Sequence, residues 1–161
     1  MQHSKAKSGM SDGMTRAHYR TFALNLIISA VIMYFVMFTM IYGLSEFYNN
    51  LNMAYMAIMM AAPMGMLMLV MMGSMYNDRR LNLVLLGGFA LLFALAFWGM
   101  RAQVLVGDRQ FLRAMIPHHS GAVLMCERAS LKDPEIKQLC SQIIVSQKEE
   151  IAKMKAILER K

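Results

Sequence analysis

Histidine and sulfur side chains gather in one short stretch near the carboxyl end of the 161-residue chain. The run from Met115 to His119 (MIPHH) is followed by Met125 and Cys126. Imidazole nitrogen with thioether or thiolate sulfur is the donor set that copper prefers, and the sulfur donors favour copper(I) over copper(II). Methionine suits an oxidising compartment, because it binds without losing a proton and cannot form a disulfide. The pattern indicates a copper site, and the alternative is methionines that fill a core beside polar histidines near a helix start.

The two histidines cannot chelate one ion from a single helix. Adjacent side chains diverge by about 100° around a helix, whereas a chelate needs a spacing of four residues. His118 and His119 therefore indicate two sites, or one inward histidine and one that faces a neighbouring chain. A ferritin-type di-iron centre needs several inward carboxylates and Glu-x-x-His repeats, and here only Glu150 and Glu127 are placed to contribute.

The elements that must position these residues are two helices. Residues 101–161 show an amphipathic helical pattern that stops once, at Asp133-Pro134, where Asp133 can cap a helix and Pro134 can occupy its first position. The apolar and donor residues recur at heptad-like steps in both arms: Phe111, Met115, His118, Ala122, Met125 and Ala129, then Ile136, Cys140, Ile143, Gln147, Glu150, Met154 and Ile157. This predicts an antiparallel helix hairpin.

Folding the hairpin about residue 133 sets Cys126 opposite Cys140, His119 opposite Gln147, and Met115 near Met154. For the cysteine pair, a disulfide that staples the arms and two buried thiols rank equally, ahead of a thiolate pair on copper(I). A hairpin of about 50 residues is near the size at which a lone core is marginal. A second copy would complete a four-helix bundle, although the membrane helices or another subunit would also serve.

The rest of the chain is strongly apolar. The hydrophobic content of 57% exceeds that of soluble proteins, and between Thr21 and Met100 the charged residues are Glu46, Asp78, Arg79 and Arg80. Three transmembrane helices are predicted, at about residues 22–44, 51–75 and 81–100. We expect an all-α chain: a basic leader (residues 1–21) at the lipid headgroups, the three spans (22–100) and the helix hairpin (101–161).

Orientation follows from the lysines and arginines that flank the spans. Six lie before the first span and in the second loop, namely Lys5, Lys7, Arg16, Arg20, Arg79 and Arg80. On the opposite side lie three: Arg101, Arg109 and Arg113. The count favours a cytoplasmic N-terminus and a tail outside, which in a bacterium means the inner membrane and the periplasm.

The second span is rich in methionine. Seven of its methionines fall within one stripe, which could pass a soft cation: Met53, Met56, Met60, Met64, Met68, Met71 and Met75. Met60-x-x-x-Met64 is similar to the Met-x-x-x-Met of the three-span eukaryotic copper transporters. The alternative is packing, because methionine is flexible and apolar.

Taken together, the tail motifs resemble the domain of unknown function 305 family. The residues that carry the resemblance span about 108–158 and are Asp108, Phe111, the run from Met115 to His119, Ala122, Met125, the turn Asp133-Pro134-Glu135, Gln147, Glu150, Ile151 and Met154. The resemblance implies a ferritin-like helical bundle, usually extracytoplasmic, associated with copper binding and copper tolerance. It points to Met115, His118, His119, Met125 and Met154 as ligands and to Gln147 and Glu150 as polar partners.

The favoured interpretation is a non-enzymatic copper-binding membrane protein that captures, buffers or hands over copper to a periplasmic copper protein or a membrane complex. The chain shows no nucleophile with a base, no phosphate loop and no dinucleotide motif, and its charge pattern is that of membrane flanks rather than of nucleic-acid binding. Two alternatives remain: a copper(I) transporter that uses the methionine stripe, and a metal-free structural or assembly subunit of a membrane complex.

Overall fold

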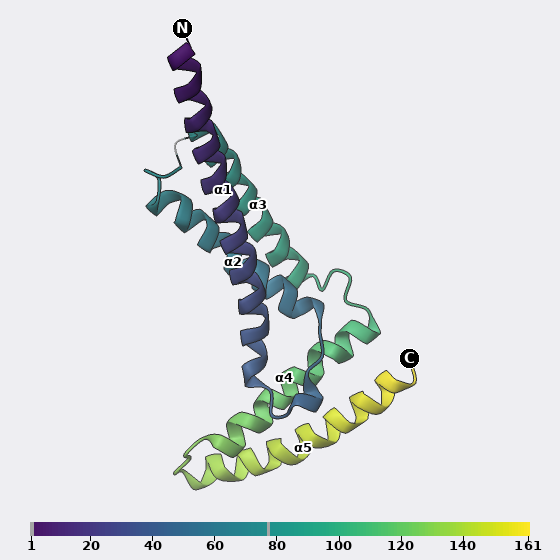
Figure 1. Cartoon of the computed structure of the whole chain (residues 1–161). Helices are drawn as coiled ribbons and strands as arrows, with labels where there is room; N and C mark the ends of the chain where they lie inside the picture. The colour runs from purple at the N-terminus through teal and green to yellow at the C-terminus, as the bar shows by residue number, and fades with distance from the viewer. Residues whose placement is uncertain (1, 77) are drawn as a thin grey trace. The chain divides into compact units, whose positions relative to one another are not determined.

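The protein is described by a computed structural model that covers the backbone of residues 2–76 and 78–161 and the side chains of residues 17–76 and 78–161. Within these residues the chain is all α-helical (Figure 1). The long helices are α1 (Gln2–Val36), α2 (Leu51–Met71), α3 (Arg79–Arg101), α4 (Asp108–Arg128) and α5 (Pro134–Glu159). Two short 3₁₀ helices, η1 (Met37–Met40) and η2 (Leu44–Glu46), lie between α1 and α2. The predicted all-α class is confirmed.

Three segments are long and apolar enough to cross a membrane: Ala17–Met40, Leu51–Met71 and Arg79–Arg101. Most of their apolar surface is exposed in the chain, as expected for helices that meet lipid. The predicted boundaries shift by a few residues. The second segment ends at Met71 because residues 72–75 form a turn, and the third begins after Asp78, whose carboxylate accepts hydrogen bonds from the backbone N–H groups of Arg80 and Leu81.

The basic leader is continuous with the first span in α1. The side chains of Lys5, Lys7 and Arg16, which belong to this leader, are not among those that the structure describes.

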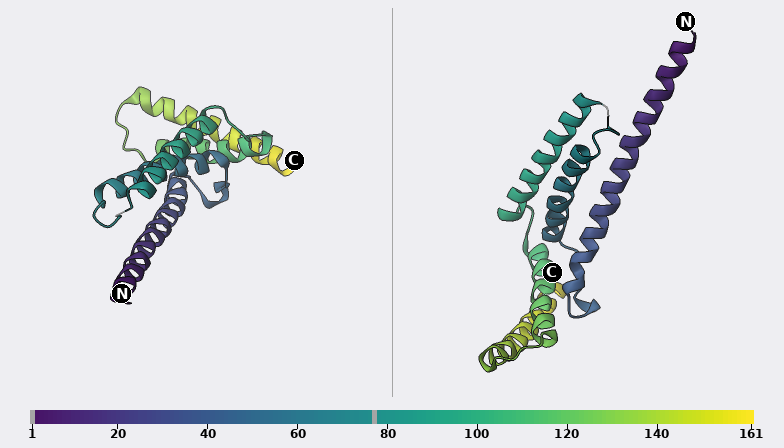
Figure 2. Two further views of the ribbon diagram at one scale, coloured as in Figure 1. Left: turned by 90° about the horizontal axis from the view of Figure 1, so that it is seen from above. Right: turned by 90° about the vertical axis from the view of Figure 1, so that its left-hand side faces the viewer.

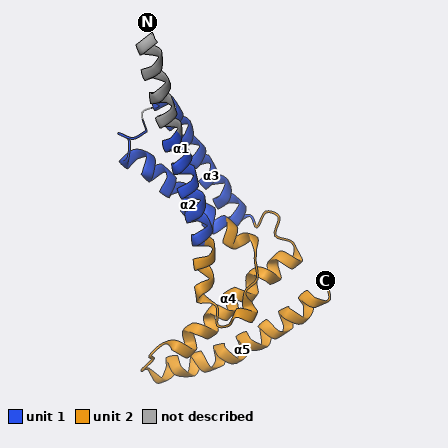
Figure 3. Ribbon diagram, in the orientation of Figure 1, with its two compact units in different colours: residues 1–33, 55–102 blue, residues 34–54, 103–161 orange. Residues whose placement is uncertain are grey.

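The chain divides into two compact units (Figure 3). Unit 1 contains residues 1–33 and 55–102, and unit 2 contains residues 34–54 and 103–161. The loop between the first two apolar segments therefore belongs with the tail, which a division of the sequence at residue 101 does not anticipate.

Unit 1 consists of α1, α2 and α3 packed alongside one another (Figure 2). Its core holds Phe22, Leu69 and Tyr76. Close approach depends on Gly65, where a Cβ atom would lie 3.0 Å from the Phe89 ring and 3.2 Å from Leu26. Small residues at such positions let helix backbones approach, which is the usual basis of helix packing in lipid.

Unit 2 is built around the hairpin of α4 and α5. Asp133 caps α5 by accepting hydrogen bonds from the N–H groups of Glu135 and Ile136, and Pro134 begins the helix, as predicted. Cys126 and Cys140 form a disulfide that joins the two arms near this turn. At the opposite end, Lys161 pairs with Asp108, and this pairing lowers the pKa of the Asp108 carboxyl. The predicted hairpin is thus present and is held at both ends.

Candidate metal-binding face

One side of α4 is covered by the loop that contains η1 and η2. Ile116, Ser120 and Val123 are almost completely buried, and Leu112 joins them. At Gly121 a Cβ atom would lie 3.3 Å from the backbone oxygen of Met40, so the loop backbone approaches α4 closely. The hairpin therefore finds part of its packing partner within its own chain.

A polar contact, which we call the clasp, fastens this loop to the hairpin. It consists of Tyr42, Glu46, Ser120 and Lys155. The buried Ser120 hydroxyl lies 2.5 Å from Oε2 of Glu46, to which it donates, and 2.6 Å from the backbone N–H of Tyr42, from which it accepts. Lys155 of α5 places its Nζ 3.8 Å from the second oxygen of Glu46. The buried hydroxyl thus both donates and accepts a hydrogen bond, as expected for a buried polar group.

The clasp was missed by reasoning from the sequence. The available signal is Glu46, which is the only charged residue between Thr21 and Tyr76. A carboxylate alone in an apolar stretch needs a partner when it is buried, because desolvating an unpaired charge is costly. The sequence does not reveal that the partner is a serine 74 residues further along the chain.

A second polar contact lies beside the clasp. Nζ of Lys148 is 2.8 Å from Oε1 of Glu127 and 5.2 Å from the centre of the Tyr42 ring. The hydrogen bond from Lys148, followed by one from the Tyr42 hydroxyl, lowers the pKa of Glu127, and the same Glu127 contact raises the pKa of Lys148. Glu127 is therefore engaged in an ion pair on the covered side of the hairpin and is a poor candidate for a metal ligand.

His119 faces the second arm. Its Nδ1 lies 2.8 Å from Oε2 of Glu150, and Oε1 of Glu150 accepts a hydrogen bond from Ser146 at 3.1 Å. The two atoms are at an ion-pair distance, but their geometry is not that of a hydrogen bond, and the buried Nδ1 has no other hydrogen-bond partner among the described residues. The fold-back predicts Gln147 opposite His119, and Glu150 lies about one helical turn beyond Gln147, while the disulfide between Cys126 and Cys140 keeps the predicted register. A carboxylate beside one imidazole nitrogen leaves the other nitrogen, Nε2, for a metal.

The remaining candidate ligands lie on the side of the hairpin that the loop leaves uncovered. The loop contacts Ser120 and Gly121 on α4 and Lys148 and Lys155 on α5. At 100° per residue, one group of residues lies within about 40° of the point opposite the buried Ser120 on α4 and about 100–160° around α5 from Lys148. We call it the donor face, and it comprises Phe111, Met115, His118, Ala122, Met125 and Ala129 of α4 with Gln147, Glu150 and Met154 of α5.

Exposure agrees with this assignment. Met125 is 54% exposed, His118 is exposed, and Met115, Met154 and Gln147 are partly buried. The ring centres of His118 and His119 are 6.1 Å apart, with His119 turned to α5 and His118 to the exposed side. One histidine points inward and one outward, and whether the outward one faces a neighbouring chain, as one of the two predicted arrangements has it, stays a prediction.

The structure limits what one copy can offer a metal. Among the described residues, no group of three or more His, Cys, Asp or Glu side chains is placed to hold an ion. The disulfide removes Cys126 and Cys140 as thiolate ligands, so of the three alternatives for this pair the structure contains the disulfide. The donors that remain are the imidazoles and the thioethers, which is a set suited to copper(I) rather than to harder ions.

Most of the methionine stripe lies beside the packed face of α2, and Met68 packs against the core of unit 1. The buried residues of α2 are Ala57, Ala61, Ala62, Gly65 and Leu69. The exposed members of the stripe are Met56, Met60, Met71 and Met75, and the partly buried members are Met53, Met64 and Met68. Met75 lies beyond the end of the helix, and Met53 belongs to unit 2. Within unit 1 the exposed members of the stripe form an open surface.

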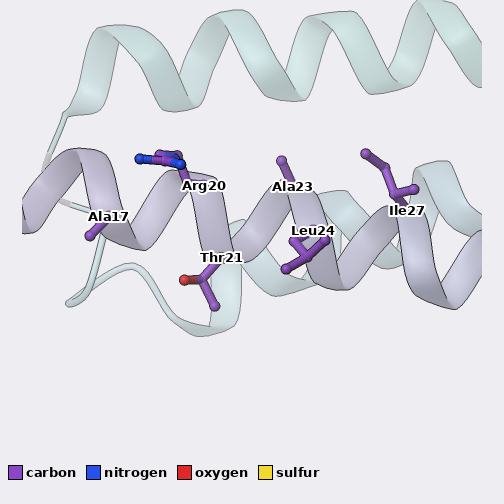
Figure 4. A pocket seen from close by; sticks show the side chains of 6 residues that line it. All are labelled: Ala17, Arg20, Thr21, Ala23, Leu24 and Ile27. Atoms are coloured by element: carbon purple, nitrogen blue, oxygen red, sulfur yellow. The ribbon is translucent and has the colours of Figure 1, made fainter.

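A hollow on α1 carries no donor set. Figure 4 shows it to be lined by residues of that one helix, all within or beside the first apolar segment: Ala17, Arg20, Thr21, Ala23, Leu24 and Ile27. It contains no histidine or sulfur ligand, so the donor face remains the candidate site.

Comparison with known proteins finds a family model that matches the tail. The model of a domain of unknown function, DUF305, matches residues 99–158. An uncharacterized protein of Acanthamoeba polyphaga mimivirus is 33% identical over 114 residues, which cover 70% of this chain and 73% of the viral protein. That alignment is longer than the segment matched by the family model, so the similarity extends beyond the tail. No solved structure matches the chain.

Proposed function

Because the chain belongs to the DUF305 family, we propose that it is a membrane-anchored, non-enzymatic copper-binding protein whose α4–α5 hairpin captures copper(I) and buffers it or hands it to a partner protein. The observation that carries the proposal is the donor face. It gathers three thioethers and an exposed imidazole on one side of a hairpin, next to His119, whose Nδ1 faces Glu150.

The donor chemistry fits the metal. Thioether and imidazole are neutral ligands that bind copper(I) without releasing protons. Glu150 would orient the His119 ring and favour the tautomer that carries its proton on Nδ1, so that Nε2 is the basic nitrogen. Such partners of a ligand commonly change metal affinity by about 10–100-fold.

We also propose that the tail lies in the periplasm of a bacterial inner membrane, with the N-terminus in the cytoplasm. The excess of arginine and lysine beside Ala17 and in the loop before α3 supports this orientation. The disulfide between Cys126 and Cys140 supports it independently, since disulfides persist in oxidising compartments. Methionine ligands suit that compartment because they are not consumed by oxidation to disulfides.

The test is a copper(I) titration of the full-length protein in detergent micelles, in competition with a chromophoric chelator. The whole chain is needed, because a fragment of the tail would expose Ser120, which the loop covers. We expect His118→Ala, which removes a ligand, to weaken binding by about 100-fold, and Glu150→Gln, which removes the partner of His119, to weaken binding by about 10-fold.

His18→Ala is the matched control, since it removes a histidine from α1 and leaves the donor face intact. It should bind copper(I) as the wild type does. If the wild type competes no better than the His118→Ala variant, the proposed function is wrong.

A further inference from the structure

The donor face is an uncovered helix surface with a coiled-coil repeat. Its α4 residues follow alternating steps of four and three: Phe111, Met115, His118, Ala122, Met125 and Ala129. This spacing is that of the a and d positions through which two helices pair. None of the six is an acidic or strongly basic residue, whereas the same helix carries Arg109, Arg113 and Arg128 elsewhere. Phe111 and Met125 are more than half exposed within one copy.

We propose that this face pairs with the same face of a second copy, with the two α4 helices antiparallel, and that the pairing completes the copper site with donors from both copies. The pairing itself stands on the α4 pattern, while its metal content rests on the proposed function.

The antiparallel register follows from side-chain size. It sets Phe111 opposite Ala129 of the second copy, His118 opposite Ala122 and Met115 opposite Met125. Each layer then joins a large side chain to a small one or two methionines to each other, which fills the interface evenly. A parallel register would set alanine against alanine and phenylalanine against phenylalanine, and it would align the helix dipoles unfavourably.

The available area is sufficient for a tethered dimer. A helix of 21 residues is about 32 Å long and about 10 Å wide, so its paired face measures roughly 320 Å² per copy in projection. Standard stable interfaces bury about 800 Å² per partner. Anchoring in one membrane raises the effective concentration of the two copies, which offsets the smaller area.

The same register explains why one copy looks incomplete as a metal site. Met115 and His118 lie one turn apart on α4, and Met125 lies more than two turns away, about 15 Å from Met115 along the helix axis. In the antiparallel pair, Met125 of the second copy lies opposite Met115. Each dimer would then hold two equivalent sites, each with Met115 and His118 from one copy and Met125 from the other.

Cross-linking without copper tests the pairing. The variant Phe111→Cys/Ala129→Cys places thiols at positions that the register joins, and none of the proposed ligands is changed. A short bismaleimide reacts with these thiols and leaves the native disulfide intact, since the two native cysteines are both bonded. The double variant in micelles should become a covalent dimer, while Phe111→Cys alone should not, because its two copies would lie about 27 Å apart.

Efficient cross-linking of the single Phe111→Cys variant would show a parallel pair and overturn the register. Failure of the double variant to cross-link, together with a monomeric mass by light scattering, would overturn the pairing. Both results are independent of copper, so they are distinguishable from failure of the proposed function, in which the wild type binds no copper.

Mixed dimers test the shared site. Met115→Leu and Met125→Leu should each spoil both sites of their own dimers. A dimer of one variant with the other, isolated through two different affinity tags, should regain one intact site and bind about half the copper(I) of the wild type. If the mixed dimer binds no more than either parent, the ligands come from single copies and the shared site is wrong.

Discussion

At the scale of single residues, the sequence identifies the donors but not the polar contacts that hold them in place. Met115, His118 and Met125 could be listed from donor chemistry and helical spacing, and the structure puts them on one face. The clasp between Glu46 and Ser120 could not be listed, because it joins residues 74 positions apart and depends on how a short loop folds. Local spacing carries information about one helix, and it carries none about contacts of this range.

Ser120→Ala tests the clasp. Removing the hydroxyl leaves the Tyr42 N–H and one oxygen of the Glu46 carboxylate without their partner, and both are partly buried. We expect unit 2 to lose about 1–3 kcal/mol of stability, which hydrogen exchange should reveal as faster exchange of the α4 amides. Ser141→Ala is the matched control, because that hydroxyl is exposed and bonds only within its own helix. Equal exchange in the two variants would contradict the assignment.

At the scale of elements, heptad spacing and the Asp133-Pro134 stop predict the hairpin, and the fold-back predicts that Cys126 faces Cys140. These features are local or nearly so, and the structure confirms them. The contact of His119 differs, since the structure places it against Glu150 rather than Gln147. The disulfide falls at the register that the fold-back predicts, so the difference lies in which side-chain atoms meet, which sequence periodicity does not describe.

The disulfide should stabilise the hairpin by limiting the freedom of its unfolded chain. For a loop of this length, 14 positions from Cys126 to Cys140, the expected contribution is about 3 kcal/mol. Reduction with a dithiol should therefore lower the thermal midpoint of unit 2, followed by circular dichroism and by exchange of α5 amides. A Cys126→Ser/Cys140→Ser variant should already have the low midpoint and should not respond to the dithiol. A variant that keeps the wild-type midpoint would show that the disulfide contributes nothing.

At the scale of the whole molecule, composition and length predict the three apolar helices, because hydrophobic runs of this length are read directly from the sequence. The assignment of residues 34–54 to the same unit as the tail could not be predicted. In the sequence this loop is only a short connection, and its partner is formed by residues that follow two further helices.

The proposed orientation can be checked with reporter fusions. Alkaline phosphatase, which is active only in the periplasm, should be active when fused after Lys161 and inactive when inserted in the loop before Arg79. Replacing Arg79 and Arg80 with alanine should reduce the difference between the two fusions, since under the proposed orientation these two charges hold the loop inside. Activity only in the loop fusion would reverse the orientation.

The clasp has a consequence for how this tail can be inherited or engineered. Ser120 and Lys155 both contact Glu46, which lies in a segment that precedes α2. If α4 and α5 were grafted onto a foreign anchor, the apolar side of α4 would be exposed and the Ser120 hydroxyl would lack its hydrogen-bond partner. The transplantable unit is the hairpin together with residues 34–54, and a functional chimera should need both pieces from the same parent.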